Sequence, residues 1–290
     1  MSFRDLHYGP SPLVLPNAWD VPSALALVDA GFAAIGTTSF GVAASHGLPD
    51  GNRSTKDANL VLAGQLSGLP AQLSFDIEDG YADEPDRVAE YVARLGRVAG
   101  INIEDSSGER LIDPGVHAAK VAAIKDRCPE VFVNARVDTY WLGEQASVEA
   151  TLERAMAYVR AGADGIFVPG ASDPAQLRAI TSAVAVPVNV LPIAGLSLVD
   201  LSGLGVRRVS TGSLPYRAAV HAAVAAATAV RDGGSTPAAT PYADLQGRLV
   251  RHAESTEGTE GTEGTNHAQA TNQPQASDQP QETNRPGADS

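Results

Sequence analysis

Eight short runs of β-type residues recur along the first 211 residues of the chain, and segments with helical periodicity separate most of them. This alternation predicts βαβ units and a parallel sheet. Eight units within about 210 residues are typical of a closed (β/α)8 barrel of the TIM type, because an open doubly wound sheet usually has fewer strands. No Gly-x-Gly-x-x-Gly motif follows the first run, which further disfavours a dinucleotide-binding sheet. The runs are residues 13–17, 33–39, 72–78, 100–105, 132–138, 165–169, 187–191 and 207–211.

Prolines and glycines mark the ends of the helices expected between these runs. Pro22, Pro85 and Pro174 fall where a first helical turn begins, a position that tolerates the missing N–H of proline. Gly31 and Gly162 fall where a helix ends. The predicted helices include residues 21–29, 85–95, 115–127, 148–161 and 174–181.

The composition changes at Glu254, after which the chain contains no aliphatic side chain larger than Ala. Such a segment buries too little apolar area to offset the entropy lost on ordering. We therefore expect one barrel domain in residues 1–253 and a disordered, acidic, low-complexity tail in residues 254–290. The tail holds seven acidic residues and one arginine, so it contributes about half of the formal net charge of −13.

Composition also limits the partners and the compartment of the chain. Its Lys and Arg residues do not cluster, so we expect no nucleic-acid partner, because neutralising phosphates requires clustered cations. No apolar run approaches the roughly 20 residues of a membrane-spanning helix, and the N-terminus shows no secretory signal pattern. We expect a cytoplasmic protein without a membrane partner. The one cysteine, Cys128, excludes an intrachain disulfide and precedes the fifth run, at the barrel end opposite the expected site.

Acidic residues end two neighbouring predicted strands. Asp76 and Glu78 close the run 72–78, and both are expected to point toward the barrel axis because successive strand side chains alternate between faces. Glu104 is the last residue but one of the next run, 100–105, and shares a face with Asn102. Carboxylates that converge on a barrel mouth repel one another unless a cation or shared protons neutralise them. Oxygen ligands suit a hard divalent cation, above all Mg2+, although each acid has helix capping as an alternative role.

An arginine and a turn of small residues end two further strands. Arg136 is suited to bidentate capture of a substrate carboxylate, or it pairs with Glu104. The segment 36–41 offers backbone N–H groups to the other side of an anion, and an ordinary polar turn is equally compatible with it. None of the three lysines lies at a predicted strand end, which disfavours a Schiff-base mechanism.

Taken together, these residues resemble the phosphoenolpyruvate mutase/isocitrate lyase superfamily across roughly residues 10–225. The motifs that carry the resemblance are PNAWD at 16–20, residues 33–41, SHGLPDG at 45–51, DIEDGY at 76–81, NIED at 102–105 and NAR at 134–136.

The resemblance implies a Mg2+-dependent enzyme, with Mn2+ as an alternative metal. It implies that Asp76 is the principal metal ligand and that three further acids, Glu78, Glu104 and Asp50, hold metal-bound waters. Arg136 and Glu104 are the implied catalytic residues. The implied contacts to a small carboxylic acid substrate come from Thr38, Ser39, Phe40 and Arg136. Members of this superfamily stabilise an enolate formed when a C–C or P–C bond breaks, and the resemblance further implies a homo-dimer or homo-tetramer that exchanges a C-terminal helix.

One segment departs from the pattern of the family. Lyases that cleave isocitrate or methylisocitrate carry a KKCGH or KRCGH lid after the fourth strand, and mutases carry a lid with Lys and Asn; residues 104–114 contain neither. Two alternatives remain for this segment. Either one of its polar residues replaces the lid as general acid, or all of them are solvated loop residues; the candidates are Ser106, Ser107, Glu109 and Arg110.

The leading hypothesis is a Mg2+-dependent lyase that cleaves a C–C bond in a small 2-oxo or 2-hydroxy (di)carboxylic acid. The alternatives are a phosphonopyruvate-type mutase or hydrolase, and a non-catalytic barrel that binds a carboxylate.

Overall fold

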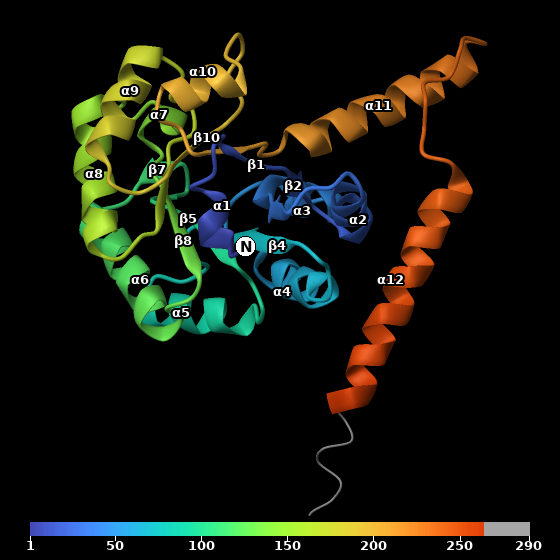
Figure 1. Ribbon diagram of the computed structural model, residues 1–290, viewed down its shortest axis with the longest axis horizontal. Helices are drawn as coiled ribbons and strands as arrows, with labels where there is room; N and C mark the ends of the chain where they lie inside the picture. The colour runs from blue at the N-terminus through green and yellow to red at the C-terminus, as the bar shows by residue number, and fades with distance from the viewer. Residues whose placement is uncertain (264–290) are drawn as a thin grey trace, which may run out of the picture. The chain divides into compact units, whose positions relative to one another are not determined.

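The computed structural model describes residues 1–263 of the chain, with side chains through residue 255. Within this range, nine parallel strands form one sheet in the order β1-β11-β10-β9-β8-β5-β4-β3-β2 (Figure 1). The strands are β1 (Leu13–Leu15), β2 (Asn17–Ala18), β3 (Ala34–Thr37), β4 (Gln72–Asp76), β5 (Gly100–Glu104), β8 (Phe132–Arg136), β9 (Gly165–Phe167), β10 (Val188–Val190) and β11 (Arg208–Ser210).

The sheet closes on itself through its first two strands. Only Pro16 separates β1 from β2, and β1 pairs with β11 while β2 pairs with β3. The two short strands therefore occupy one strand position of the barrel, so that the barrel has the eight strand positions that the sequence predicts. The predicted (β/α)8 fold is confirmed.

Helices follow most strands, and many of them pack around the outside of the barrel. They are α1 (Phe3–Leu6), α2 (Val21–Asp29), α3 (Ser39–Ser45), α4 (Lys56–Leu66), α5 (Pro85–Arg94), α6 (Pro114–Arg127), α7 (Thr139–Leu142), α8 (Val148–Arg160), α9 (Pro174–Ala183), α10 (Leu198–Gly203), α11 (Leu214–Arg231) and α12 (Tyr242–Glu263). Their starts follow local chemistry. Asp20 caps α2 by accepting a hydrogen bond from the Ser23 N–H, and Ser147 caps α8 in the same way through Ala150.

The main core lies between the sheet and these helices. Strand residues that alternate with the interior-facing ones are fully buried there, such as Phe75 and Ile77 around the end of β4, and Ile101 and Ile103 on β5. Complete burial of each aliphatic side chain contributes about 1.5–3 kcal/mol. The core fixes the strands, and with them the residues at the strand ends.

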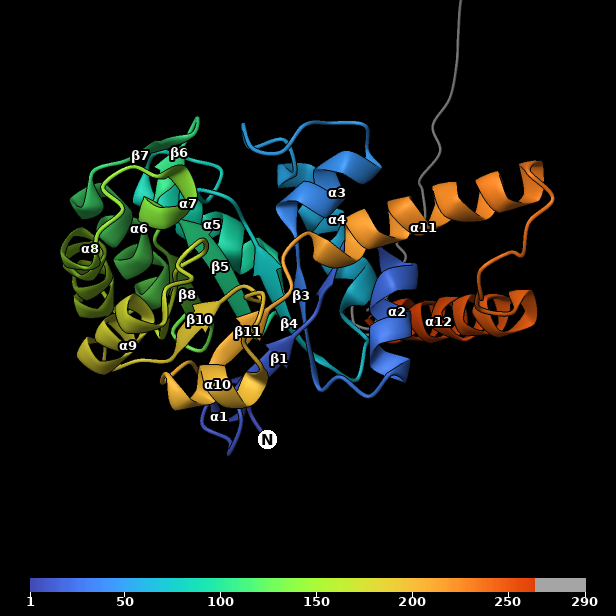
Figure 2. The same ribbon diagram turned by 90° about the horizontal axis from the view of Figure 1, so that it is seen from above.

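The amino-terminal end of the barrel is closed by α1. Phe3 packs edge-on against Phe132, the first residue of β8, at a ring distance of 5.5 Å. A Cβ on Gly100, the first residue of β5, would lie 2.6 Å from the Phe3 ring, so the close approach requires glycine there. Figure 2 shows α1 at one end of the barrel and α3, β6 (Ser106–Ser107) and β7 (Arg110–Leu111) at the other. The opposite, carboxyl end is the end left for a functional site.

The chain divides into two compact units, residues 1–248 and 249–290. The first contains the barrel and α11, and α12 begins in it and continues into the second as far as Glu263. The helix thus includes residues 254–263 of the predicted tail, and the predicted boundary at residue 254 stays a prediction. The disorder predicted for residues 264–290 lies outside the described residues. No helix of the part described is long and apolar enough to cross a membrane.

Candidate active site at the carboxyl end of the barrel

Two adjoining cavities open at the carboxyl ends of the strands. The inner cavity has a volume of about 90 Å3 and the outer one of about 560 Å3. Ser39, Asp50, Arg136 and Trp141 line both, so the two are continuous parts of one site. The other predicted site residues also line it: Thr38, Phe40 and Asp76 in the inner cavity, and Glu78 and Glu104 in the outer one. The structure therefore brings every predicted residue to one mouth, while their roles stay predictions.

Asp76 is the last residue of β4 and lies in the inner cavity. Its backbone N–H donates to Thr37 Oγ1 at 2.9 Å, and its Oδ2 accepts from the backbone N–H of Ser39 at 3.1 Å. Thr38 precedes the first turn of α3, so the predicted turn of small residues is the start of a helix whose first N–H group, that of Ser39, faces Asp76. Burial raises the pKa of the Asp76 carboxyl, and Arg136 acts in the opposite direction.

Glu78 reaches the mouth by a turn, because β4 ends at Asp76, two residues before the end of the predicted run. The alternation argument for Glu78 is therefore wrong: its φ is 50°, in the left-handed region. Its carboxylate accepts hydrogen bonds from Thr55 Oγ1 at 2.5 Å and from the backbone N–H of Arg53 at 2.7 Å. Burial raises the pKa of Glu78, and these hydrogen bonds oppose the shift. Glu78 thus fixes the loop that carries Asp50 over the strand ends.

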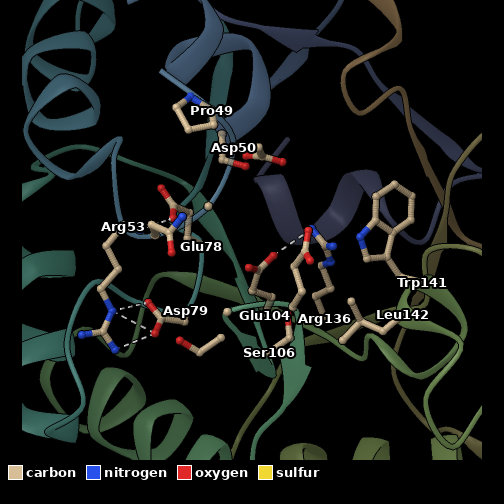
Figure 3. Close-up of a pocket in the computed structure, with 16 residues that line it drawn as sticks. Pro49, Asp50, Arg53, Glu78, Asp79, Glu104, Ser106, Arg136, Trp141 and Leu142 are labelled. Atoms are coloured by element: carbon tan, nitrogen blue, oxygen red, sulfur yellow. Dashed lines mark hydrogen bonds and ion pairs between the residues drawn. The ribbon is translucent and has the colours of Figure 1, made fainter. Parts of the chain in front are cut away.

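Arg136 and Glu104 end β8 and β5 in matched register. Arg136 Nη1 lies 2.9 Å from Glu104 Oε2 (Figure 3). Its Nε donates to Asp138 Oδ1 at 2.6 Å. The guanidinium also lies 5.5 Å from the ring centroid of Trp141 and 5.8 Å from that of Phe167. Arg136 pairs with Glu104 and also lines both cavities. Pairing with Glu104 and binding of a substrate carboxylate are therefore compatible roles for it.

The electrostatics of this pair are dominated by burial and by neighbouring charge. Burial alone would lower the pKa of Arg136, but the charges of Asp138 and Glu104 outweigh it and raise the pKa. Burial raises the pKa of Glu104 well above its ordinary value, against the opposing charge of Arg136. Arg136 therefore remains a cation at neutral pH.

The segment that replaces the family lid is a small hairpin. β6 and β7 pair antiparallel, and Gly108 and Glu109 form the turn with φ of 57° and 59°. Ser106 Oγ donates to Asp138 Oδ2 at 2.6 Å, and Arg110 lies 3.4 Å from Glu144. Of the residues considered as general acid, Ser106, Ser107 and Glu109 line the outer cavity.

The donor set fits a hard divalent cation that keeps several waters. Among the residues with described positions, no group of three or more His, Cys, Asp or Glu converges closely enough to bind a metal ion directly. An ion held directly by Asp76, with Glu78, Glu104 and Asp50 acting through waters, does not require such convergence. Burial raises the pKa of Asp76, Glu78 and Glu104, which means that their charged forms are unfavourable without a cation. A cation bound among them would stabilise the charged forms. The same oxygen donors suit Mn2+.

Several lining residues are missing from the sequence-based site. Asn17, in the PNAWD motif, donates from Nδ2 to the Thr37 carbonyl at 2.6 Å and accepts at Oδ1 from the Gly212 N–H at 2.9 Å, so it ties the closing strands together beside the inner cavity. Its position at a strand end was a usable signal. Trp141 lies on α7, which has four residues and no periodic pattern, so nothing in the sequence marked it.

A second ion pair orders the far side of the outer cavity. Arg53 binds Asp79 in bidentate fashion, with Nε to Oδ1 at 2.9 Å and Nη2 to Oδ2 at 2.6 Å, and it also pairs with Asp83. Lys120 donates to the backbone carbonyl of Asp79 at 2.8 Å. These partners are distant in sequence, so only the folded chain reveals the pair.

Comparison with known proteins gives a consistent assignment. A family model for phosphoenolpyruvate phosphomutase matches residues 3–231. An uncharacterized protein of Mycobacterium tuberculosis is 60% identical over 259 residues, which cover 89% of this chain and 100% of that protein. The oxaloacetate decarboxylase of Pseudomonas fluorescens is 31% identical over 240 residues, covering 76% of this chain and 81% of that enzyme. The crystal structure of phosphonopyruvate hydrolase with oxalate and Mg2+ is 24% identical, covers 93% of this chain and 100% of that one, and superposes with a TM-score of 0.72, which supports the same fold.

Proposed function

The chain belongs to the phosphoenolpyruvate phosphomutase family, and we propose that it is a Mg2+-dependent lyase that cleaves a C–C bond in a small 2-oxo or 2-hydroxy carboxylic acid. The observation that carries this proposal is the grouping of Asp76, Arg136 and the start of α3 around one cavity of about 90 Å3. That cavity has room for the compact 2-oxo carboxylate end of a substrate.

The head of the substrate would be held by the residues of the inner cavity. Arg136 is a permanent cation oriented by Glu104 and Asp138, so it can receive a carboxylate without first being positioned. The backbone N–H groups of Ser39 and Phe40, at the first turn of α3, and the hydroxyl of Thr38 would contact the other side of the same group. The aromatic rings of Trp141 and Phe167 lie beside the guanidinium and add cation–π contacts to it.

Mg2+ would be held by Asp76, with Glu78, Glu104 and Asp50 on its waters, and it would supply a Lewis acid beside the 2-oxo oxygen. The protein groups do the remaining work. Arg136 would orient the substrate carboxylate. Glu104, opposite Arg136 at the ends of β5 and β8, would hold the guanidinium in position through their ion pair. In loss of CO2 from a 3-carboxy-2-oxo acid, the electron pair of the breaking C–C bond would pass into the remaining oxo acid fragment, and Arg136 on its carboxylate would help to stabilise the negative charge.

The hairpin β6–β7 restricts the kind of bond cleavage that the site can support. Residues 104–114 supply no Cys, His or Lys as a proton donor. A reaction whose product fragment is protonated by water after the bond has broken needs no general acid from this loop. Loss of CO2 from a 3-carboxy-2-oxo acid is such a reaction. The similarity to an oxaloacetate decarboxylase supports this reaction type.

A panel of 2-oxo and 2-hydroxy acids incubated with the purified protein and Mg2+, with products identified by mass spectrometry, tests the proposal. We expect C–C cleavage of at least one acid, dependent on Mg2+ or Mn2+. Phosphonopyruvate belongs in the panel, because P–C cleavage without C–C cleavage would favour the mutase or hydrolase alternative. Binding of acids without any turnover would favour a non-catalytic carboxylate-binding barrel.

We also propose that the active form is a homo-dimer or homo-tetramer. None of the residues of α11 is buried, and Val220, Val224 and Val230 on it are exposed. An 18-residue helix with exposed valines needs a covering surface, which a second copy can supply. Light scattering of the purified chain tests this, and a monomer at assay concentration would contradict it.

A further inference from the structure

The interior of the barrel contains an arginine that has no anionic partner among the described side chains. Arg208 lies on β11, is 1% exposed, and reaches across the barrel to β5 on the opposite side. Its Nη2 donates to Asn102 Oδ1 at 3.1 Å, while its Nε and Nη1 have no hydrogen-bond partner. Its guanidinium carbon lies 6.0 Å from the ring centroid of Phe3, which closes the amino-terminal end. Arg208 therefore lies between that end and the residues of the inner cavity.

A buried cation without a counter-charge is unfavourable for the folded state. Burial lowers the pKa of Arg208 to about 9, and the charge of Asp76 opposes the shift. The guanidinium still carries its charge at neutral pH, so the folded protein contains a poorly solvated cation. Unfavourable burial of this kind is typical of functional sites, where the charge acts on a ligand or on a group that binds one.

Asn102 connects this charge to the inner cavity. It is paired with Asp76 in the register of β4 and β5, and it lines the inner cavity. Its Oδ1 accepts hydrogen bonds from Arg208 and, at 2.8 Å, from Asn134 Nδ2. A guanidinium has only donors, so the atom that faces it must be the amide oxygen, and the orientation of the Asn102 amide is thereby determined.

The nitrogen of the same amide is available to a ligand. Among the described residues, Asn102 Nδ2 has no acceptor, and it is not sealed in the core as Nε and Nη1 of Arg208 are. Two hydrogen bonds to Oδ1, one of them from a cation, polarise the amide and make Nδ2 a stronger donor. Asn102 thus offers N–H groups to an acceptor in the cavity that Asp76 and Arg136 also line.

Resting on the proposed function, we infer that Asn102 is a further substrate-binding residue and that Arg208 is a positioning residue that acts through it. Asn102 Nδ2 donates a hydrogen bond to an oxygen of the 2-oxo carboxylate head. Arg208 fixes the amide with its nitrogen toward the cavity and strengthens it as a donor. Because the oxygen of Asn102 is engaged by Arg208 and Asn134, the residue serves the substrate and not the metal ion.

Binding of oxalate, which consists of the head group alone, tests the role of Asn102. Its dissociation constant is measured by calorimetry on the full chain at saturating Mg2+, and that of Mg2+ is measured without oxalate. In Asn102→Ala we expect oxalate to bind at least about tenfold more weakly, because a hydrogen bond to a charged group is lost. The affinity for Mg2+ should stay within about twofold of the wild type.

Two further variants separate this effect from damage to the fold. Asn102→Asp keeps the shape of the side chain and gives Arg208 a carboxylate partner, so it should fold, yet it should also lose at least about tenfold in oxalate affinity. Asn189→Ala is the matched control. Asn189 is also buried inside the barrel, forms two hydrogen bonds with Ser210 and lines neither cavity, so this variant should bind oxalate nearly as the wild type does.

Arg208→Met tests the positioning role, because it removes the charge at a similar side-chain volume. Urea unfolding without Mg2+ should show a variant at least as stable as the wild type, since an unpaired buried charge is replaced by an apolar group. The same variant should bind oxalate about fivefold or more weakly, whereas an arginine that only supports the fold would lose stability. In the Asn102→Ala background, Arg208→Met should change oxalate affinity by less than about twofold.

The outcomes separate the inference from the proposed function. If the wild type does not bind oxalate with Mg2+, the head site of the proposed function fails and the inference fails with it. If the wild type binds oxalate and both Asn102 variants bind it as tightly, the head site stands and the inference is overturned. Equal losses in Asn102→Ala and Asn189→Ala would also overturn it. An effect of Arg208→Met that is as large in Asn102→Ala as in the wild type would overturn the role of Arg208.

Discussion

Glu104 and Arg136 occupy matched positions at the ends of adjacent strands β5 and β8, and 2.9 Å separates Oε2 of the glutamate from Nη1 of the arginine. The register of the sheet creates this contact without help from any loop. The arginine is thereby oriented before a substrate arrives, and the glutamate still faces the cavity that contains Asp50 and Glu78. One ion pair connects the metal side of the proposed site to its substrate side.

Arg136→Lys should weaken substrate binding, because an ammonium group cannot reproduce the fork of a guanidinium toward a carboxylate. We expect kcat/KM to fall by about 10- to 100-fold, which corresponds to roughly 1.5–3 kcal/mol for a charge-assisted hydrogen bond. Steady-state kinetics on the best substrate of the panel measures it. Arg87→Lys, at an exposed arginine on α5 that pairs with Glu90 and lines neither cavity, is the matched control. Unchanged kinetics in Arg136→Lys would show that Arg136 only supports the fold.

The position of this pair could be predicted from the sequence, and other parts of the site could not. Asp76, Glu104 and Arg136 end runs of apolar residues, and the carboxyl ends of parallel strands meet at one rim. Glu78 also follows such a run, but its backbone conformation is set by hydrogen bonds from Arg53 and Thr55, more than twenty residues earlier. Contacts of that kind leave no periodic trace in the sequence.

The same contrast applies to the fold. The predicted helix 21–29 is confirmed as α2, because proline and a capping aspartate mark its start. The predicted start of α6 differs by one residue, since Asp113 caps the helix and Pro114 begins it. The hairpin β6–β7 was expected only as a short loop, because its two-residue strands are too short to show alternation.

Acid should destabilise the protein through its buried histidines. Burial lowers the pKa of His117 from 6.5 to about 3 and that of His7 from 6.5 to about 4. The unfolded chain binds these protons below about pH 6.5 and the folded protein does not, so stability is lost as pH falls from 6.5 toward 4. Each histidine should contribute a slope of up to about 1.4 kcal/mol per pH unit.

Urea unfolding of His117→Phe and His117→Leu between pH 7 and pH 4.5 checks the effect. Both variants should show a shallower dependence of the unfolding free energy on pH than the wild type, whatever their absolute stability. His221→Gln, at an exposed histidine on α11, is the control. An unaltered slope in both His117 variants would mean that this histidine does not resist protonation in the folded state.

Isocitrate and 2-methylisocitrate should be poor substrates. The hairpin supplies no Cys, His or Lys to protonate the departing carbanion, and Cys128 lies at the end of α6, before β8 begins. Absence of a positioned general acid typically costs about 10²- to 10⁴-fold in rate. Glyoxylate release from isocitrate by the purified protein measures this. Rapid release that disappears in Asp76→Ala would show that another residue acts as the acid.

Removal of residues 254–290 should have little effect on the barrel. The segment contains no aliphatic side chain larger than Ala, so it has few apolar contacts to lose. We expect a change in Tm of no more than about 2 °C and nearly unchanged activity. Thermal unfolding followed by circular dichroism, together with the best assay of the panel, tests this. A large drop in either quantity would show that the segment docks on the folded part.

The central claim is that Asp76 holds the metal on which the reaction depends. Asp76→Ala removes the proposed direct ligand at the end of β4 while the strand pairing of Ser74 and Phe75 with β5 remains, so the fold should persist. Mg2+ titration by calorimetry, run in parallel with turnover of the best 2-oxo acid, measures the consequence directly. The account predicts native circular dichroism, loss of most Mg2+ affinity, and a fall in turnover of at least about 10³-fold. Wild-type Mg2+ affinity and wild-type turnover in Asp76→Ala would contradict it.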